Sequence, residues 1–284
     1  MAPRSQPTAR QVRLGAELRR LREAAGLKAR EVAELLNSTS AQMSVVEAGL
    51  AGASEERVRR LAAVYGCTDE ALIEALVAIA VDRTRGWWEQ YRGVLDPVFL
   101  DTAEIEYHAA YLREVVTYYV PGLLQTADYA RAVFAYTNPG HSEEDVALRV
   151  EHRMKRKAVI ERDTPVPYET IVHEFALRVH VSDRRASLAQ LRFILDKIDA
   201  GQAVVRVIPV EREGFAGAGA SMLYIGGPVR QLDTALRDAP TGARHIDAQP
   251  QLEHLRTLFR RVQTAALDPV ASRDFIHRLS KELS

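Results

Sequence analysis

The chain has 284 residues, 38 basic and 38 acidic side chains, and a hydrophobic fraction of 47%. These values describe an ordinary globular protein that is long for one domain and comfortable for two. A single cysteine, Cys67, excludes an intrachain disulfide framework and favours a reducing cytoplasm. No leader sequence is apparent, and the most apolar run (71–81) is too short to span a bilayer. We therefore expect a cytoplasmic protein without a membrane segment.

The charge is unevenly distributed along the chain. Residues 1–66 carry eleven Lys or Arg and seven Asp or Glu residues, a net charge of +4, which leaves −4 for the remainder. A basic bias of this size permits a polyanionic partner such as DNA without demanding one.

The first eighty residues predict five consecutive short helices after a disordered tail over residues 1–9. Apolar side chains recur at helical spacing, and Gly26 and Gly49 mark the ends of the first and third helices. Thr39 is a favourable N-cap for the third helix, in which Met43 and Val46 face inward. The expected helices cover residues 12–24, 28–36, 40–48, 54–65 and 68–81. Together they predict a compact helical domain over residues 10–82.

Beyond residue 83 we expect an α+β domain that continues to residue 284. Pro97 separates two helical stretches, and the β-branched and aromatic run 115–120 reads as extended chain before Pro121. Ser142 and Asp145 predict a capping box for a long helix. Strands are expected at 168–174, 203–210 and 221–227, and helices at 121–136, 142–162, 187–200, 250–267 and 268–283. The glycine-rich stretch 214–227 reads as a loop leading into a strand.

Several strings resemble a known family of regulators. "LRRLREAAGLKAREVAELLN" followed by "MSVVEAG" resembles the Xre or lambda-repressor-like helix-turn-helix. "RGWWEQY", "VPGLLQTADYARAV", "RVEHRMKRK", "HEFALR" and "VRVIPV" resemble actinobacterial regulators with the C-terminal domain of unknown function DUF5753, including Scr1-type and WhiJ-like proteins. The resemblance covers roughly residues 10–280. It implies a cytoplasmic, homodimeric transcription regulator, often encoded beside a small partner protein of the DUF397 type.

The resemblance also assigns the DNA-facing residues. It makes 28–36 the first helix of the motif and 40–48 the recognition helix, so positions 40, 41, 42, 44 and 45 face the major groove. Among these only Gln42 can make a bidentate base contact, typically to adenine. The residues expected to contact double-stranded DNA are Lys28, Arg30, Thr39, Ser40, Gln42 and Ser44.

The expected interface carries little positive charge. The family usually has a glutamine near position 29 and basic residues near 42, 45 and 50, where this chain has Ala29, Gln42, Val45 and Leu50. Residues 28–52 hold two cations and three carboxylates, a net charge of −1. Because phosphate neutralisation dominates DNA affinity, the motif needs arginines from its flanks. The candidates are Arg19, Arg20, Arg57, Arg59 and Arg60. The alternative is a helix-turn-helix kept only as a folding module.

A cluster of aromatic and acidic residues suggests a second site. On a continued helix, Tyr107 and Tyr111 are one turn apart, with Glu104, His108 and Glu114 near the same face. Aromatic walls with few polar groups suit a planar organic ligand. The expected pocket comprises Trp87, Trp88, Tyr107, His108, Tyr111, Glu114 and Tyr118. Two other interpretations stay open: packing of these tyrosines between domains, and a catalytic pair of His108 with a glutamate.

The remaining motifs are less informative. The basic stretch 149–157 has a net charge of +4 and reads as a solvated helix face, or as a contact for DNA or an acidic partner. No spacing of His or Cys predicts a metal site, and no cofactor or nucleophile motif is present. The leading hypothesis is a DNA-binding regulator that senses a small molecule or a partner protein. Its alternatives are a repurposed scaffold that binds small molecules or catalyses a biosynthetic step, and a protein–protein adaptor.

Overall fold

A computed structural model describes residues 7–213, 221–237 and 244–284, and these fall into two compact units. The first unit contains Met1–Ile105 together with Gly227–Asp233, and the second contains Glu106–Gly226 and Thr234–Ser284. The division expected at residue 83 therefore does not coincide with the compact units. Within the described ranges, every helix is too short or too polar to cross a bilayer.

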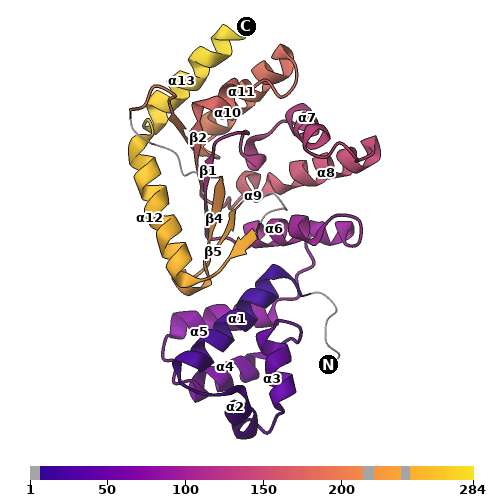
Figure 1. Cartoon of the computed structure of the whole chain (residues 1–284), viewed down its shortest axis with the longest axis vertical. Helices are drawn as coiled ribbons and strands as arrows, with labels where there is room; N and C mark the ends of the chain where they lie inside the picture. Colours follow the sequence, from indigo (N-terminus) through magenta and orange to yellow (C-terminus); the bar gives the residue numbers. More distant parts are fainter. Residues whose placement is uncertain (1–6, 214–220, 238–243) are drawn as a thin grey trace. The chain divides into compact units, whose positions relative to one another are not determined.

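The first unit is helical, as the sequence predicts (Figure 1). Its helices are α1 (Ala9–Ala24), α2 (Ala29–Leu35), α3 (Ser40–Glu47), α4 (Glu55–Val64) and α5 (Glu70–Val81), followed by the 3₁₀ turn η1 (Trp87–Tyr91) and most of α6 (Pro97–Tyr107). Their apolar stripes meet in one core. The following core side chains, one from each helix α1 to α5, have no exposed surface: Leu18, Val32, Met43, Leu61 and Leu76.

Helix α1 begins earlier than the apolar periodicity predicts. The Thr8 hydroxyl accepts a hydrogen bond from the Gln11 amide, and the Gln11 carboxamide accepts one from the Thr8 amide at 3.1 Å. Asp101 accepts a further bond from the Ala9 amide at 3.0 Å. These contacts satisfy amides that a helix start leaves open, so residues 7–9 are ordered where a disordered tail was expected. Residues 1–6 of that tail lie outside the described residues.

A segment distant in sequence completes the helical core. The loop 227–233, which joins strands β4 and β5, contributes Leu232 and Val229 to the core of the first unit. The Arg13 guanidinium donates to the backbone carbonyls of Gln231 and Asp233. No local pattern predicts this arrangement, because the partners of the loop are some 220 residues upstream.

The second unit is built on a six-stranded sheet of order β3-β2-β1-β4-β5-β6 (Figure 1). The strands β1 (Tyr111–Val116), β2 (Tyr168–His173) and β3 (Val204–Ile208) are parallel to one another. The strands β4 (Met222–Gly226), β5 (Thr234–Arg237) and β6 (Arg244–Ile246) continue the sheet in antiparallel pairs. β2, β3 and β4 confirm the predicted strands, whereas β5 and β6 are too short to give a sequence signal.

Helices cover both faces of this sheet. Leu252, Leu255, Phe259 and Val262 of α12 pack on one face against residues that include Val115, Ile171 and Tyr224. Figure 1 shows α8 and α9 on the other side of the strands. The helices and turns are η2 (Gly122–Leu124), α7 (Ala127–Thr137), α8 (Glu143–Arg156), α9 (Ala158–Glu161), α10 (Glu174–Arg178), α11 (Arg184–Asp199), α12 (Gln249–Ala265) and α13 (Pro269–Glu282). A third 3₁₀ turn, η3 (Arg230–Leu232), belongs to the first unit. The capping box at Ser142 and Asp145 is confirmed.

The helix expected to continue through Tyr111 and Glu114 is wrong. α6 ends at Tyr107, and residues 111–116 form β1, which pairs with β2 on one side and β4 on the other. The ladder hydrogen bonds and cross-strand packing on both sides outweigh the local helical spacing. β1 also ends at Val116, so Tyr118 and Tyr119 lie beyond the strand.

Replacing Leu232 by Ala tests whether the loop 227–233 belongs to the helical core. We expect the free energy of unfolding of the first unit to fall by about 2–3 kcal/mol, because a buried Leu-to-Ala change leaves a cavity. Both tryptophans lie in this unit, so their fluorescence during urea unfolding reports its stability. Val270→Ala, at an exposed position of α13, is the control. Equal midpoints for the two variants would show that the loop does not contribute.

Candidate nucleic-acid interface

Helix α3 presents one apolar face to the core and one small, polar face to solvent. Met43 is fully buried and Val46 is 3% exposed, which confirms both as inward positions. The outward residues Ser40, Ala41, Gln42 and Ser44 are exposed, and Val45 is half-buried. The turn before α3 places Asn37 at a φ of 49°, a left-handed conformation that asparagine tolerates. α2, this turn and α3 therefore have the geometry of a helix-turn-helix.

A buried ion pair and a close backbone crossing hold α3 against α1. The Arg22 guanidinium donates to both carboxylate oxygens of Glu47, at 2.6 and 2.9 Å, and to the Leu27 carbonyl at 2.8 Å. The side chains of Arg22 and Glu47 are 10% and 8% exposed. At Gly15 a Cβ atom would lie 2.5 Å from the Glu47 carbonyl oxygen, so only glycine fits this crossing. The ion pair and the close crossing therefore fix the position of α3, and of its exposed face, relative to α1.

Most cations around this face already have carboxylate partners. Arg30 pairs with Glu34, Arg19 with Glu23 and Arg20 with Glu17, while Arg59 pairs with both Glu55 and Glu74. In the described part of the chain, Lys28, Arg57 and Arg60 have no carboxylate partner. Arg57 lies against α3, with Nη2 3.8 Å from the Met43 sulfur. Exposed pairs are worth about 0–1 kcal/mol, so phosphates can displace the carboxylates of Arg30 and Arg19.

The N-terminus of α3 is closed by side chains that were expected to contact DNA. Thr39 is the N-cap, and its hydroxyl accepts from the Gln42 amide at 3.2 Å. The Gln42 side-chain oxygen accepts in return from the Thr39 amide at 3.3 Å and from the Ser38 hydroxyl at 2.7 Å. Ser44 donates its hydroxyl hydrogen to the Ser40 carbonyl at 3.0 Å. The cap therefore constrains which hydrogen bonds this face can offer to a ligand.

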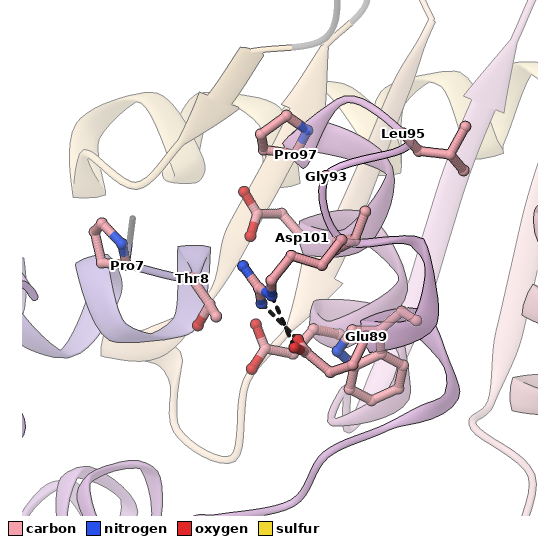
Figure 2. A pocket seen from close by; sticks show the side chains of 11 residues that line it. Pro7, Thr8, Glu89, Gly93, Leu95, Pro97 and Asp101 are labelled. Carbon is pink, nitrogen blue, oxygen red and sulfur yellow. Dashed lines mark hydrogen bonds and ion pairs between the residues drawn. The ribbon is translucent and has the colours of Figure 1, made fainter. Parts of the chain in front are cut away.

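Trp88 lines a small pocket in the first unit. It is buried, and the edge of its ring lies where a Cβ on Gly86 would stand. The pocket measures about 40 Å³ and is lined by Pro7, Thr8, Trp88, Glu89, Arg92, Gly93, Leu95, Pro97, Leu100, Asp101 and Glu104 (Figure 2). Sites for planar organic ligands are usually about 300 Å³ or larger. This pocket suits a water molecule, and Trp87 packs beside it against Trp88 and Tyr91.

Glu104, which lines this pocket, has a buried carboxyl group with a raised pKa. One of its carboxylate oxygens is buried with no hydrogen-bond partner among the described residues. Burial raises the pKa of Glu104 to about 7, although a hydrogen bond from Thr8 and the charge of Arg10 act in the opposite direction. Sequence reasoning placed Glu104 near the candidate aromatic cavity but did not predict its raised pKa, because its burial depends on packing against the start of α1.

Within the second unit, the structure does not bring the predicted ligand residues into one place. Tyr107 and His108 contact each other with ring centroids 5.0 Å apart, and Arg162 lies over the Tyr107 ring. Tyr111 stacks on Tyr224 at 6.3 Å and covers Gly226 on the α12 face of the sheet.

Glu114 points to the opposite face, since side chains alternate along a strand, and there it accepts a hydrogen bond from the Tyr168 hydroxyl. Tyr168 is buried, and this burial next to the Glu114 carboxylate raises its pKa well above the ordinary value. Tyr111 and Glu114 therefore cannot line one cavity, and both have structural partners.

Tyr118 lies beyond the end of β1, next to Phe175. Sequence reasoning predicted Tyr118 as a ligand-pocket residue but did not identify Phe175. Its ring meets Phe175 edge-to-face at 6.1 Å. Tyr118, Phe175 and Val210 each follow the end of a parallel strand by two residues, and they are 59%, 50% and 66% exposed. Carboxyl ends of parallel strands meet at one sheet edge, so these residues form an exposed apolar edge cluster. In the sequence, Tyr118 and Val210 lie inside the predicted extended runs 115–120 and 203–210, and only Phe175 follows a predicted strand end.

The basic stretch 149–157 is not a solvated face. The Arg156 guanidinium forms a two-point ion pair with the buried Glu106 carboxylate, and Lys157 lies over the Phe193 ring at 4.2 Å. Arg153 donates to the Gln125 side chain and covers Phe134. These cations serve the interior of the second unit, because their long side chains cross the helix surface to reach partners below it.

Metal ligation finds no support in the part of the chain that the structure covers, where no group of three His, Cys, Asp or Glu side chains is placed to hold an ion. The glycine-rich loop that was expected to lead into β4 falls, over residues 214–220, outside the described residues.

Comparison with known families agrees with this geometry. A family model described as a helix-turn-helix domain matches residues 13–76. A second model, described as a domain of unknown function (DUF5753), matches residues 99–278, more than half of the chain. Among curated proteins and among solved structures, nothing matches.

Glu104→Gln tests the buried carboxyl. The folded state holds its proton up to about pH 7, whereas the unfolded state releases it near 4.5, so stability falls as pH rises between these values. We expect the free energy of unfolding to fall by about 3 kcal/mol across this window in the unmodified chain. The Gln variant should lose this dependence. Urea titrations at pH 4.5, 6 and 8 measure it, and parallel pH profiles for both proteins would contradict the assignment.

Proposed function

Because the chain belongs to the DUF5753 family and carries a helix-turn-helix domain, which indicates DNA binding and regulation, we propose that it is a cytoplasmic, homodimeric transcription regulator. In this proposal α3 enters the major groove of an operator, and the two subunits contact half-sites about one helical turn apart. The observation that carries the proposal is the exposed face of α3 on a helix that Gly15 and the Arg22–Glu47 pair hold in place.

Phosphate contacts come from few residues in this proposal. Lys28, Arg57 and Arg60 supply cations without displacing a carboxylate, and Arg30 supplies one by exchanging Glu34 for a phosphate. Lys28 is the N-cap residue of α2, and Arg57 contacts Met43 of α3. In this proposal, both cations lie at the edges of the groove-facing surface. A homodimer doubles this small set. The motif's net charge of −1 therefore does not prevent binding, but it predicts a modest dependence on salt.

A salt titration tests this proposal. With one phosphate contact from each of Lys28, Arg57 and Arg60 in each subunit, and before any contribution from Arg30, the slope of log K against log salt should be about −5 for the dimer. Lys28→Ala should weaken binding to every duplex and make this slope smaller by about 2, whereas Lys281→Ala in α13 should change neither. Electrophoretic shift assays on intergenic DNA beside the gene provide the measurement. If no fragment shifts at 50 mM salt, the proposal fails.

The second unit contributes sensing in this proposal. In sheets with parallel strands, ligands bind beyond the carboxyl ends of the strands. The edge cluster of Tyr118, Phe175 and Val210 occupies this place, and its exposed rings suit a planar organic ligand. A small partner protein of the DUF397 type is the alternative occupant.

The runner-up function is a repurposed scaffold that binds small molecules, or acts in biosynthesis, without binding DNA. The observation that favours it is the shortage of unpaired cations around α3, together with the exposed edge cluster. The shift assay above separates the two functions, since this one requires that no duplex binds while the ligand does.

A planar dye tests the edge cluster. We expect the double variant Tyr118→Ser, Phe175→Ser to bind 8-anilinonaphthalene-1-sulfonate at least about fivefold more weakly than the unmodified chain, because the rings supply the apolar contact. Tyr136→Ser is the matched control, since Tyr136 is an exposed tyrosine on α7. Fluorescence titration measures the affinities. Equal affinity in the double variant and the control would remove the edge cluster as the site.

A further inference from the structure

The carboxamide of Gln42 is engaged on one side only. Its oxygen accepts hydrogen bonds from the Thr39 amide at 3.3 Å and from the Ser38 hydroxyl at 2.7 Å. A carboxamide oxygen has two lone pairs, and these two donors occupy both. The backbone amide of Thr39 can only donate, so the orientation of the carboxamide follows from the cap itself. Gln42 thus presents its nitrogen, with two N–H groups, away from the cap.

The side chain of Gln42 is exposed, and no acceptor for its nitrogen exists among the described residues. It stands in the first turn of α3, where residues of a recognition helix reach the base edges. A ligand at this position therefore meets a hydrogen-bond donor pair and no acceptor.

Adenine and guanine present different hydrogen-bonding groups in the major groove to a side chain that can only donate. Reading adenine with a glutamine requires one donor and one acceptor, because adenine offers N7 as acceptor and N6 as donor. Guanine offers two acceptors, N7 and O6, at the same edge. Resting on the proposed DNA binding, we propose that Gln42 selects guanine through its two N–H groups, and that the contact with adenine expected from the sequence does not form.

The cap sets this preference. To accept from adenine N6, the Gln42 oxygen must release Ser38 or Thr39, which leaves an amide or hydroxyl at the helix start without its partner. Guanine needs no such rearrangement. Ser38 and Thr39 therefore act as positioning residues for the base contact made by Gln42.

The chain offers a matched pair of variants. Gln42→Glu keeps the capping box, because a glutamate at this position accepts the same two hydrogen bonds, but it removes both N–H donors. Ser38→Ala keeps the donors and frees one lone pair of the oxygen. Because Gln42→Glu adds a negative charge that weakens all DNA binding, the readout is the ratio of affinities for guanine and adenine at one position. Circular dichroism confirms that both variants remain helical.

The experiment uses the full-length chain and a duplex selected from a randomised pool. Each guanine of the selected site is replaced in turn by 7-deazaguanine, which lacks N7, and each adenine by purine, which lacks the 6-amino group. At one position we expect 7-deazaguanine to weaken binding about tenfold in the unmodified chain and not at all in Gln42→Glu. Ser38→Ala should lower the guanine-to-adenine ratio at that position.

Three outcomes would overturn the proposal. A Gln42-dependent adenine whose replacement by purine weakens binding would show that the side-chain oxygen accepts from the base. An unchanged base preference in Gln42→Glu would show that the side chain reads no base. A pool from which no duplex is selected would overturn the proposed function itself, and this result does not depend on Gln42.

Discussion

The position of α3 depends on its attachment to α1, where a nearly buried arginine and glutamate meet beside a helix crossing that admits no side chain. Removing one partner of such a pair leaves an uncompensated charge and costs about 3–5 kcal/mol. Gly15 allows the two backbones to approach, and Arg22 with Glu47 then fixes the register of that approach. The exposed surface of α3, the orientation of its cap and the place of Gln42 all follow from this contact.

The two units use their charged residues in contrasting ways. In the first unit several arginines pair with glutamates at the surface, so the net charge of +4 over residues 1–66 leaves only a few cations for a polyanion. In the second unit, arginines and lysines such as Arg156 and Lys157 turn inward to Glu106 and to aromatic rings. The formal charge of a segment therefore says little about the charge that a partner meets.

Local signals predicted much of the fold. The caps at Thr39 and Ser142, the glycines after α1 and α3, and the apolar periodicity located helices of both units correctly. The prediction failed where long-range contacts decide the structure. β1 lies between two strands that come later in the chain, so its pairing outweighs a local pattern compatible with helix. Because this segment was interpreted as a helix, Tyr111 and Glu114 were wrongly predicted to line one pocket. In the observed strand their side chains lie on opposite faces of the sheet. Phe175 was not predicted as a site residue, because only the pairing of β1 with β2 shows that its ring lies next to Tyr118.

The loop 227–233 has a consequence for the order in which the protein is made. The chain leaves the ribosome from its N-terminus, and α1 to α5 emerge long before Leu232, which belongs to their core. The helical unit therefore stays without part of its packing until residue 233 has been synthesised and strands β4 and β5 can hold the loop between them. The helical unit is complete only after residue 233 has been synthesised, so chains that end before this residue carry an unfinished helix-turn-helix.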